Sequence, residues 1–414
     1  MSAWAPNRSD RLPRRDPGNE ADVDMLSGYG VAYFGNDWFA ENRTSSHHIA
    51  ERLSQRVPVV YIESPGQRAP KANARDLRKV WHKVQATVAP PQRLGAQLWH
   101  ATIPQLPFRR NAALRAMNFH VAQMLCRRAL RHMSAERLIS WFVAPDAGAL
   151  AGRLGEDLSV YYVTDNYAAF PGVDAATIAS MDEDLTARVD QVFVSSRTLL
   201  EAKRRLNPHT THSPHGVDVD HFRRASDPNT PRPSATVGLA RPVIGFFGLI
   251  EAWIDLELVE RVARRYSTGT VLMIGRIAAN VAALERLPNV VFTGPQPYST
   301  LPEWASAFDV AIIPYRQNQQ VYNANPLKLR EYLATGKPVV AVPTPEISEF
   351  SDVVRIGAGE DFVDLVGQAM VEDSDADRRN RLERVSAMSW DARVADILTT
   401  VAARLGEGSQ RWTA

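Results

Sequence analysis

The sequence predicts an α/β protein with two domains of similar size that face each other across a cleft. In both halves, short apolar runs alternate with amphipathic segments, as parallel strands alternate with the helices that cover them. Residues 223–241 (RRASDPNTPRPSATVGLAR) interrupt this alternation and are rich in Pro, Ser and Thr, so we interpret them as a linker. Open parallel sheets bind ligands at the carboxyl ends of their strands, which predicts a site between the domains.

The composition excludes several classes of protein. The 414 residues fit two domains, and 48 Lys and Arg nearly balance 46 Asp and Glu, which argues against a general nucleic-acid binder. The single cysteine, Cys126, excludes a disulfide scaffold and a cysteine-based zinc site, and it fits a reducing compartment such as the cytoplasm. Residues 1–28 have no periodicity and no apolar signal segment, so we expect a mobile tail.

The expected elements follow the apolar runs. The first half has predicted strands at residues 31–34, 57–62, 138–142, 160–163 and 192–194, and helices at 46–53, 111–132 and 196–206. The second half has predicted strands at residues 243–247, 270–274, 290–292, 310–314 and 338–342, and helices at 256–266, 301–308 and 327–333. The domains are then residues 29–222 and 242–388, and residues 389–414 form a helix that packs back across both.

Residues 325–341 (NPLKLREYLATGKPVVA) predict a short helix with well-marked ends, followed by a strand. Asn325 is a good N-cap, and Pro326 suits the first helical position because its missing N–H has no partner there. Gly336 ends the helix and Pro338 prevents its continuation. The free N–H groups at the amino end of such a helix attract an anion.

Two charged side chains share one face of this helix. Lys328 lies in the first turn, where its ammonium can reach a phosphate, and Glu331 is three residues further on. The Glu331 carboxylate can accept hydrogen bonds from two ribose hydroxyls. The alternative is an exposed helical ion pair between the two residues, which contributes only about 0.3–0.5 kcal/mol.

Residues 325–341 also resemble a family motif, the donor-nucleotide segment N-P-x-K-x-x-E-[YF]-x-A-x-G-x-P-V-V of GT-B glycosyltransferases of the group-1, family-4-like branch. Other stretches are similar to landmarks of the same family, namely 195–199, 215–222, 244–255, 289–302 and 308–315. The resemblance implies the GT-B fold, in which two Rossmann-like domains face an interdomain cleft, and transfer of a sugar from a nucleoside-diphosphate donor, commonly UDP.

The resemblance also implies a set of donor ligands. The implied nucleotide-binding residues are Gly248, Arg276, Gly294, Gln296, Asn325, Leu327, Lys328 and Glu331. Tyr322 and Asn323 would lie near the donor sugar. The donor is a substrate, and we expect no cofactor.

The chain departs from the family pattern at two places. Family-4 enzymes carry two glutamates eight positions apart, and the first of these positions is Asn323 here. The first loop of the donor domain often carries Arg and Lys, whereas residues 248–255 have neither. The phosphate charge would then be met by Lys328, the helix amino end, the Gly248 backbone and Arg276. The missing glutamate gives a looser likeness to xanthan-type glucuronosyltransferases.

Asp165 is the candidate catalytic base. It ends the predicted strand in residues 159–170 (SVYYVTDNYAAF), which places it at the edge that faces the cleft. A transfer that inverts the anomeric centre needs a base on the acceptor hydroxyl, and a carboxylate is a usual choice. The corresponding aspartate of xanthan-type enzymes has this role, which supports the assignment. The alternative is an aspartate that caps the next helix or turn.

Other polar residues of the first half receive different interpretations. Asp37 follows the first strand and is assigned to the acceptor side or to a structural role, with Gly35 allowing the backbone to approach the ligand. His47 and His48 begin a helix and are expected at its surface. No cluster has metal-ligand spacing, so we expect no metal. An NAD enzyme is disfavoured because no G-x-G-x-x-G follows a strand.

The stretch from residue 67 to residue 133 is strongly basic. It holds 13 Lys and Arg against one acid, Asp76, and includes Trp81, Trp99 and Phe108. Such a surface suits an anionic bilayer, so we expect a peripheral membrane protein on the cytoplasmic side with a lipid-linked or saccharide acceptor. A plain solvated surface and a nucleic-acid partner are the alternatives, and no nucleic-acid motif accompanies the charge.

The sequence therefore predicts a glycosyltransferase that uses a nucleotide sugar and a membrane-associated acceptor, such as a precursor of an exopolysaccharide. A sugar-nucleotide epimerase of the non-hydrolysing type is an alternative on the same scaffold. A glycosyltransferase-like binding protein without activity is another, because the first family glutamate is missing.

Overall fold

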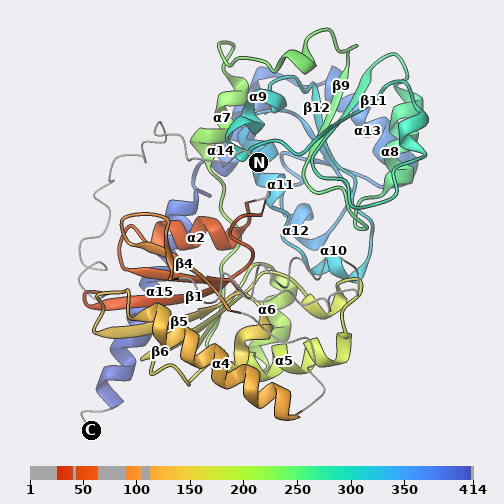
Figure 1. The fold of residues 1–414 in the computed structure, drawn as a ribbon. Helices are drawn as coiled ribbons and strands as arrows, with labels where there is room; N and C mark the ends of the chain where they lie inside the picture. The colour runs from red at the N-terminus through yellow and green to blue at the C-terminus, as the bar shows by residue number, and fades with distance from the viewer. Residues whose placement is uncertain (1–25, 41–42, 64–89, 104–111, 412–414) are drawn as a thin grey trace.

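The computed structural model describes residues 26–40, 43–63, 90–103 and 112–411, apart from some side chains near the ends of two helices. These residues form two α/β domains, one above the other in Figure 1, and the prediction of two such domains is confirmed. The expected tail falls almost entirely outside the described residues.

Within the described residues, the N-terminal domain has an eight-stranded sheet with the order β3-β4-β2-β1-β5-β6-β7-β8. All neighbouring pairs are parallel except β3 and β4. The strands are β1 (Tyr29–Gly35), β2 (Val59–Glu63), β3 (Gln92–Arg93), β4 (Leu98–Thr102), β5 (Arg137–Phe142), β6 (Leu158–Val163), β7 (Gln191–Val194) and β8 (Thr210–His212). The α-helices are α2 (Ser45–Leu53), α4 (Ala112–Leu130), α5 (Ala175–Arg188) and α6 (Arg197–Arg204), and the 3₁₀-helices are η1 (Pro145–Leu150) and η2 (Tyr167–Ala169).

The second domain is built on a parallel sheet of six described strands in the order β11-β10-β9-β12-β13-β14. The strands are β9 (Val243–Phe247), β10 (Thr270–Ile274), β11 (Val290–Gly294), β12 (Val310–Ile313), β13 (Val339–Ala341) and β14 (Arg355–Ile356). The α-helices are α7 (Val219–Arg223), α8 (Leu256–Arg265), α9 (Leu301–Ala305), α10 (Gln319–Asn323), α11 (Leu327–Ala334), α12 (Pro345–Ser348), α13 (Gly359–Val371) and α14 (Asp375–Ser386).

Each sheet separates two apolar clusters, because helices cover both of its faces. Alternate residues of a strand therefore belong to different clusters: Tyr33 packs on one side of β1 and Phe34 on the other. Strands that are buried on both faces read as continuous apolar runs, which is why the sequence revealed them. The carboxyl ends of the strands remain uncovered by these helices and carry the connecting loops.

The chain enters the second domain earlier than the predicted boundary at residue 222. Val217, Val219 and Phe222 pack in the same apolar cluster as β9 and α11. This segment therefore belongs to the second domain, because its apolar side chains are buried there and not against the first sheet.

The last helix, α15 (Trp390–Arg411), returns to the N-terminal domain. Figure 1 shows it running down along the lower domain to the C-terminus. Trp390, Ile397 and Val401 belong to the apolar cluster that covers one face of the first sheet. The two domains are thus connected by two chain crossings, one before α7 and one before α15.

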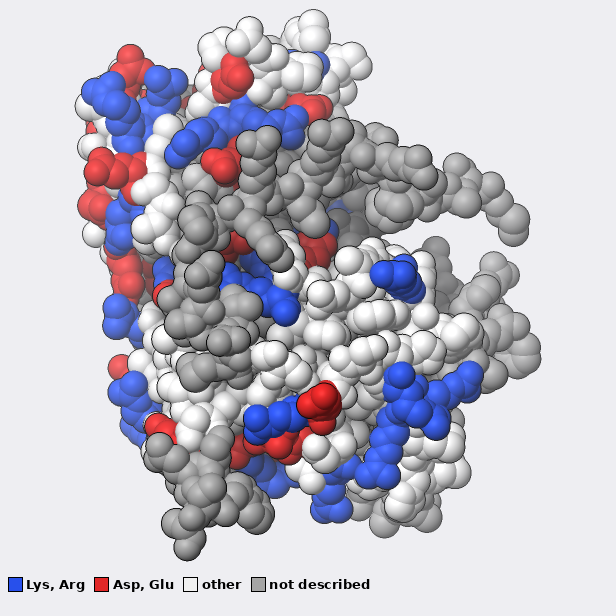
Figure 2. Space-filling view, turned by 90° about the vertical axis from the view of Figure 1, so that its left-hand side faces the viewer, with Lys and Arg blue, Asp and Glu red and all other residues white. Residues whose placement is uncertain are grey.

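The surface charge can be followed in part. Arg93, Arg127, Arg128 and Arg131 are exposed, and the other basic residues of the 67–133 stretch lie outside the described residues or have side chains that the structure does not describe. Figure 2 shows Lys and Arg gathered on the right of the lower domain, with acidic side chains among the basic ones along the left edge. In the described part of the chain, every helix is too short or too polar to span a bilayer.

Candidate active site

The amino end of α11 lies where the two domains meet (Figure 1). The helix runs from Leu327 to Ala334 and ends just before Gly336, as predicted. The backbone N–H of Phe247 donates to the Tyr332 hydroxyl at 2.8 Å, which connects the helix to the end of β9. The first turn of α11 and the carboxyl end of β9 are therefore held side by side.

Lys328 and Glu331 form an ion pair inside the cleft. The Lys328 ammonium lies 2.8 Å from the Glu331 carboxylate, and the side chains are 19% and 6% exposed. The ammonium also lies 5.0 Å from the centre of the Phe247 ring. The ion pair that the sequence left as an alternative is present, but it is largely buried, where a paired charge interacts more strongly than at an exposed helix surface.

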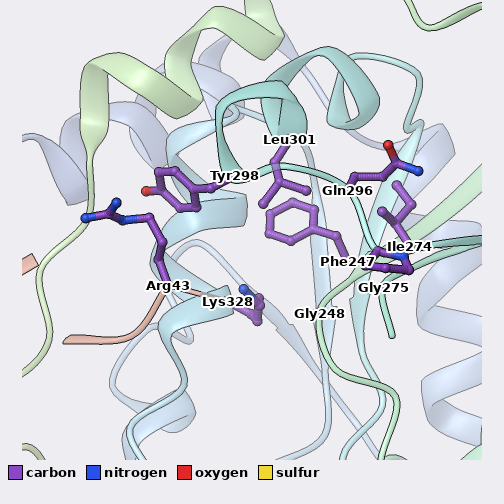
Figure 3. Close-up of a pocket in the computed structure, with 10 residues that line it drawn as sticks. Arg43, Phe247, Gly248, Ile274, Gly275, Gln296, Tyr298, Leu301 and Lys328 are labelled. Carbon is purple, nitrogen blue, oxygen red and sulfur yellow. The ribbon is translucent and has the colours of Figure 1, made fainter. Parts of the chain in front are cut away.

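An open pocket lies beside this pair, with about 380 Å³ of empty space that includes open solvent. Its described lining residues are Arg43, Phe247, Gly248, Ile274, Gly275, Pro295, Gln296, Tyr298, Leu301 and Lys328. Figure 3 shows Leu301 above Phe247, Lys328 below it, and Tyr298 and Arg43 side by side at the left. The pocket therefore joins the ends of β9, β10 and β11 to α11.

Two glycines allow the segments after β9 and β10 to pack closely against each other beside the pocket. A Cβ atom on Gly275 would lie 1.8 Å from the Gly248 carbonyl oxygen, so no larger residue fits at that crossing. The Gly248 N–H donates to the Ile274 carbonyl at 2.8 Å. Gly248, a predicted nucleotide ligand, lines the pocket, but its N–H is not available to a phosphate in this structure, because the strand-end hydrogen bond uses it.

The remaining predicted nucleotide ligands lie around the pocket and not all in it. Gln296 lines the pocket, and Gly294 immediately precedes the lining residue Pro295. Arg276 follows Gly275 and is exposed, outside the lining. Leu327 packs against the apolar cluster of the N-terminal domain, so its side chain contacts protein.

Asn325 joins the two domains. Its amide nitrogen donates to the Ser195 carbonyl at 2.6 Å and to the Glu346 carboxylate at 2.7 Å, and its amide oxygen accepts from the Arg330 guanidinium. The residue is 4% exposed. The amide nitrogen and the amide oxygen of Asn325 therefore both have protein partners. The sequence had predicted that this residue binds the nucleotide.

The predicted donor-sugar residues lie near Asp165 but outside the pocket lining. Tyr322 is 52% exposed, and the Asn323 amide donates to the Gln319 carbonyl at 2.7 Å. The helix that carries them, α10, contacts η2, which follows Asp165 in the chain. The Ser196 hydroxyl donates to the Asn323 carbonyl at 2.8 Å, which holds α10 against the N-terminal domain.

Asp165 lies directly beyond the carboxyl end of β6 and is partly exposed. Loss of hydration raises the pKa of its carboxyl to about 7, and a hydrogen bond with Thr164 partly opposes this shift. The neighbouring helix α5 is capped by Asp174, whose carboxylate accepts from the Thr177 N–H. The capping role that was the alternative for Asp165 is therefore filled by another aspartate.

Tyr315 links Asp165 to the donor side of the cleft. It follows β12 in the second domain. Burial raises the pKa of its phenol, and the negative charges of Glu331 and Asp165 raise it further. Both carboxylates thus act on one side chain, which brings the two predicted functional carboxylates to the same part of the cleft.

A Cβ atom on Gly35 would lie 2.1 Å from the Tyr61 ring, so this aromatic side chain requires the glycine, and the acceptor-side role of Gly35 stays a prediction. The expected surface position of the two histidines of α2 is wrong. His47 and His48 are 2% and 4% exposed, not at the surface. His48 stacks on Trp390 with ring centres 5.0 Å apart, and Trp390 comes from the other end of the chain.

Asp37 is exposed at the end of β1, and its carboxylate accepts from the Phe39 N–H at 3.0 Å. The carboxylate thus stabilises a local turn after β1, and the assignment of Asp37 to the acceptor side or to a structural role stays a prediction. Among the described residues, no group of three His, Cys, Asp or Glu side chains could hold a metal ion.

The sequence analysis did not identify Arg43, Phe247, Tyr298 or Tyr315. Arg43 comes from the N-terminal domain and lines a pocket of the other domain, and no local pattern reveals such a contact. Tyr298 lies within residues 289–302, which resemble a landmark of the family, so the segment was found but the residue was not.

Comparisons with known proteins agree with this architecture. Residues 241–376 match the model of the family described as glycosyl transferases group 1. A Bacillus subtilis (strain 168) protein, provisionally named teichuronic acid biosynthesis glycosyltransferase TuaH, is 29% identical over 234 residues. That alignment covers 52% of this chain and 58% of TuaH, so it spans little more than half of this relative.

Solved structures match over nearly the whole chain. Sucrose-phosphate synthase from Thermosynechococcus elongatus has a TM-score of 0.65 at 14% identity, covering 89% of this chain and 96% of that one. Anabaena HepE in complex with UDP and glucose has a TM-score of 0.61 at 14% identity, covering 90% and 99%. The second domain is therefore similar to the group 1 glycosyltransferases, and the two domains together have the GT-B fold.

Proposed function

We propose that this protein is a glycosyltransferase of polysaccharide biosynthesis that moves a sugar from a UDP-sugar to a saccharide or lipid-linked acceptor. The observation that carries the proposal is the pocket beside the amino end of α11, lined by Lys328, with Glu331 behind it and Asp165 in the facing domain. The names of TuaH and of the HepE complex with UDP and glucose support the same class of reaction and donor.

The donor would lie along the carboxyl ends of β9, β10 and β11. The Lys328 ammonium and the amino end of α11 provide positive charge for the diphosphate. The Glu331 carboxylate accepts hydrogen bonds from the ribose hydroxyls, and residues 294–296 border the base. Since Lys328 and Glu331 are already paired, both are held in position before the donor binds.

Asp165 would act as the base in an inverting transfer. Its carboxylate removes the proton of the acceptor hydroxyl while the hydroxyl oxygen forms a bond to the anomeric carbon. The bond between that carbon and the diphosphate breaks, and the nucleoside diphosphate leaves with its charge stabilised by Lys328. A carboxyl with a pKa near neutrality is a strong enough base to accept this proton and is still ionised in much of the protein.

A lipid-linked acceptor at an anionic membrane surface on the cytoplasmic side is the finer part of the proposal. Its support is the basic composition of residues 67–133, together with the exposed Arg127, Arg128 and Arg131 around the end of α4. Basic side chains near an anionic bilayer each add about 1 kcal/mol of attraction.

The test is direct. We expect calorimetric titration to show binding of UDP that is stronger than binding of ADP or GDP. We also expect UDP release from a UDP-sugar only when a saccharide or a bacterial lipid extract is present as acceptor. Absence of nucleotide binding would contradict the proposal. An epimer formed from the UDP-sugar alone would instead favour the isomerase.

A further inference from the structure

The donor pocket contains a cation that comes from the facing domain. Among its described lining residues, the two basic side chains are Lys328 and Arg43. Arg43 immediately precedes α2 of the N-terminal domain, whereas the rest of the lining belongs to the second domain. In Figure 3 the Arg43 side chain rises beside Tyr298 at one end of the pocket.

The charge balance of the site requires a further cation. A nucleoside diphosphate carries negative charge on both phosphates, but the positive charge of Lys328 is formally cancelled by Glu331. The loop after β9, residues 248–255, has no Lys or Arg and contains Glu251 and Asp255. Within the described lining of the pocket, the second domain therefore offers little net positive charge to the diphosphate, because Arg276 lies outside that lining.

Arg43 is held near the pocket but is not committed to its present partner. Its guanidinium pairs with Glu51, and the two side chains are 29% and 35% exposed. The pair is partly exposed, so solvent screens it more than a fully buried pair, and a diphosphate in the pocket can compete with Glu51 for the guanidinium. The guanidinium has five N–H donors in a planar fork that suits phosphate oxygens.

Tyr298 adds a second, independent sign of a ligand at this place. Its ring is stacked on His221, with centres 4.7 Å apart and planes within 12°, and the Arg43 guanidinium lies 5.8 Å from its centre. Its hydroxyl is buried and has no hydrogen-bond partner among the described residues. Figure 3 shows this hydroxyl on the side of the ring nearest Arg43. Buried hydroxyls are rarely left without a partner unless a ligand or water supplies one.

We propose that Arg43, together with the Tyr298 hydroxyl, binds the donor diphosphate from the N-terminal side of the cleft. This inference rests on the proposed function and specifies its donor site. The donor is then held by cations of both domains, Lys328 from one and Arg43 from the other. Arg43 replaces the basic residues that are missing from the loop after β9.

The experiment compares UDP with uridine, which lacks the phosphates, by calorimetric titration. We expect Arg43→Ala to weaken UDP binding about 10- to 100-fold, as loss of a charged hydrogen-bonding group does, and to change uridine binding less than about twofold. Arg43→Lys should fall between wild type and Arg43→Ala, because it keeps the charge but loses the fork. Tyr298→Phe should weaken UDP binding severalfold, with uridine binding unchanged.

Arg197→Ala is the matched control. Arg197 also reaches from the N-terminal domain to the second domain, where it pairs with Glu349, but it does not line the pocket. Unchanged UDP affinity in Arg43→Ala, equal losses for UDP and uridine, or an equal loss in Arg197→Ala would each overturn the inference. If wild type does not bind UDP, the proposed UDP donor fails and this inference fails with it. If wild type and Arg43→Ala bind UDP equally, only this inference fails.

Discussion

The two domains bring carboxylates to the cleft in different electrostatic states. In the second domain, the Glu331 carboxylate is nearly buried and lies 2.8 Å from the Lys328 ammonium. In the first domain, no described Lys, Arg or His forms an ion pair with Asp165, and loss of hydration raises the pKa of its carboxyl to about 7. A paired carboxylate stays ionised and is a fixed hydrogen-bond acceptor. An unpaired one can take up and release a proton near neutral pH.

This difference indicates a division of roles between the domains. The second domain has preformed polar contacts suited to binding, and the first has a group suited to proton transfer. The cleft combines the two, because the charges of Glu331 and Asp165 both reach Tyr315. Substitutions on the two sides should therefore separate turnover from donor affinity.

The largest effect is expected for Asp165→Asn. The amide cannot accept the proton of the acceptor hydroxyl, so we expect turnover to fall about 10²- to 10⁴-fold. UDP affinity should stay within about twofold, because Asp165 does not line the donor pocket. Initial rates of UDP release and calorimetric titration of UDP measure the two quantities.

Asp184→Asn is the control for this substitution. Asp184 also belongs to the first domain, where it lies on α5 and its exposed carboxylate pairs with Arg188. Its turnover should stay near that of wild type. Full turnover in Asp165→Asn would remove the base assignment and favour a route that retains the anomeric configuration.

Lys328→Ala is expected to weaken donor affinity. Removing the ammonium leaves the Glu331 carboxylate unpaired beside the donor, so UDP binding should weaken about 10- to 100-fold. Arg261→Ala, which removes an exposed cation of α8 in the same domain, should leave the affinity unchanged. Comparable losses in both variants would mean that overall charge, and not contact, determines donor affinity.

The features of the donor half that the sequence predicted have local signals. The helix α11 is bounded by residues adjacent in the chain, and Lys328 and Glu331 share a face by helical spacing alone. Burial of β9, β10 and β12 on both faces also appears directly as continuous apolar runs. The short edge strands β3, β8 and β14 were not anticipated, because two or three residues give no period.

The features of the first half that the sequence did not predict come from contacts distant in sequence. Gly35 is required by the Tyr61 ring on the neighbouring strand, and His48 is buried by Trp390 of α15. Nothing near Gly35 or His48 in the chain indicates either partner. Arg43 was missed for the same reason. Asn325 is a residue type that often caps a helix, but its amide instead donates to the Ser195 carbonyl of the other domain.

Asn325→Ala should have a smaller effect, on stability. The substitution leaves the Ser195 carbonyl without this donor and removes an acceptor from the buried Arg330 guanidinium, so we expect a loss of about 1–3 kcal/mol in the free energy of unfolding. UDP affinity of the folded protein should change little. Urea denaturation and calorimetric titration measure both.

Asn318→Ala is the matched control for Asn325→Ala. It removes a side-chain cap of α10, whose hydrogen bond to the Val321 N–H is 2.9 Å, and should cost about 1 kcal/mol. A large loss of UDP affinity in Asn325→Ala with unchanged stability would restore the nucleotide-ligand role that the sequence predicted.

The smallest expected effect concerns the pH dependence of stability. The Asp165 carboxyl has a pKa of about 7 in the folded protein, against 3.8 for an ordinary aspartate. Between these pH values the folded state binds more protons than the unfolded state, so this residue makes stability fall as pH rises. Asp165→Asn removes this contribution of Asp165 to the pH dependence of stability. The variant should be more stable than wild type by about 1–2 kcal/mol at pH 8, since partial exposure limits the effect, and the difference should vanish near pH 4. Urea denaturation of both proteins at pH 4, 6 and 8 measures the difference. Equal stability of the two proteins at pH 8 would mean that the Asp165 carboxyl ionises in the folded protein at little cost. The raised pKa that makes Asp165 a suitable base near neutral pH would then be contradicted.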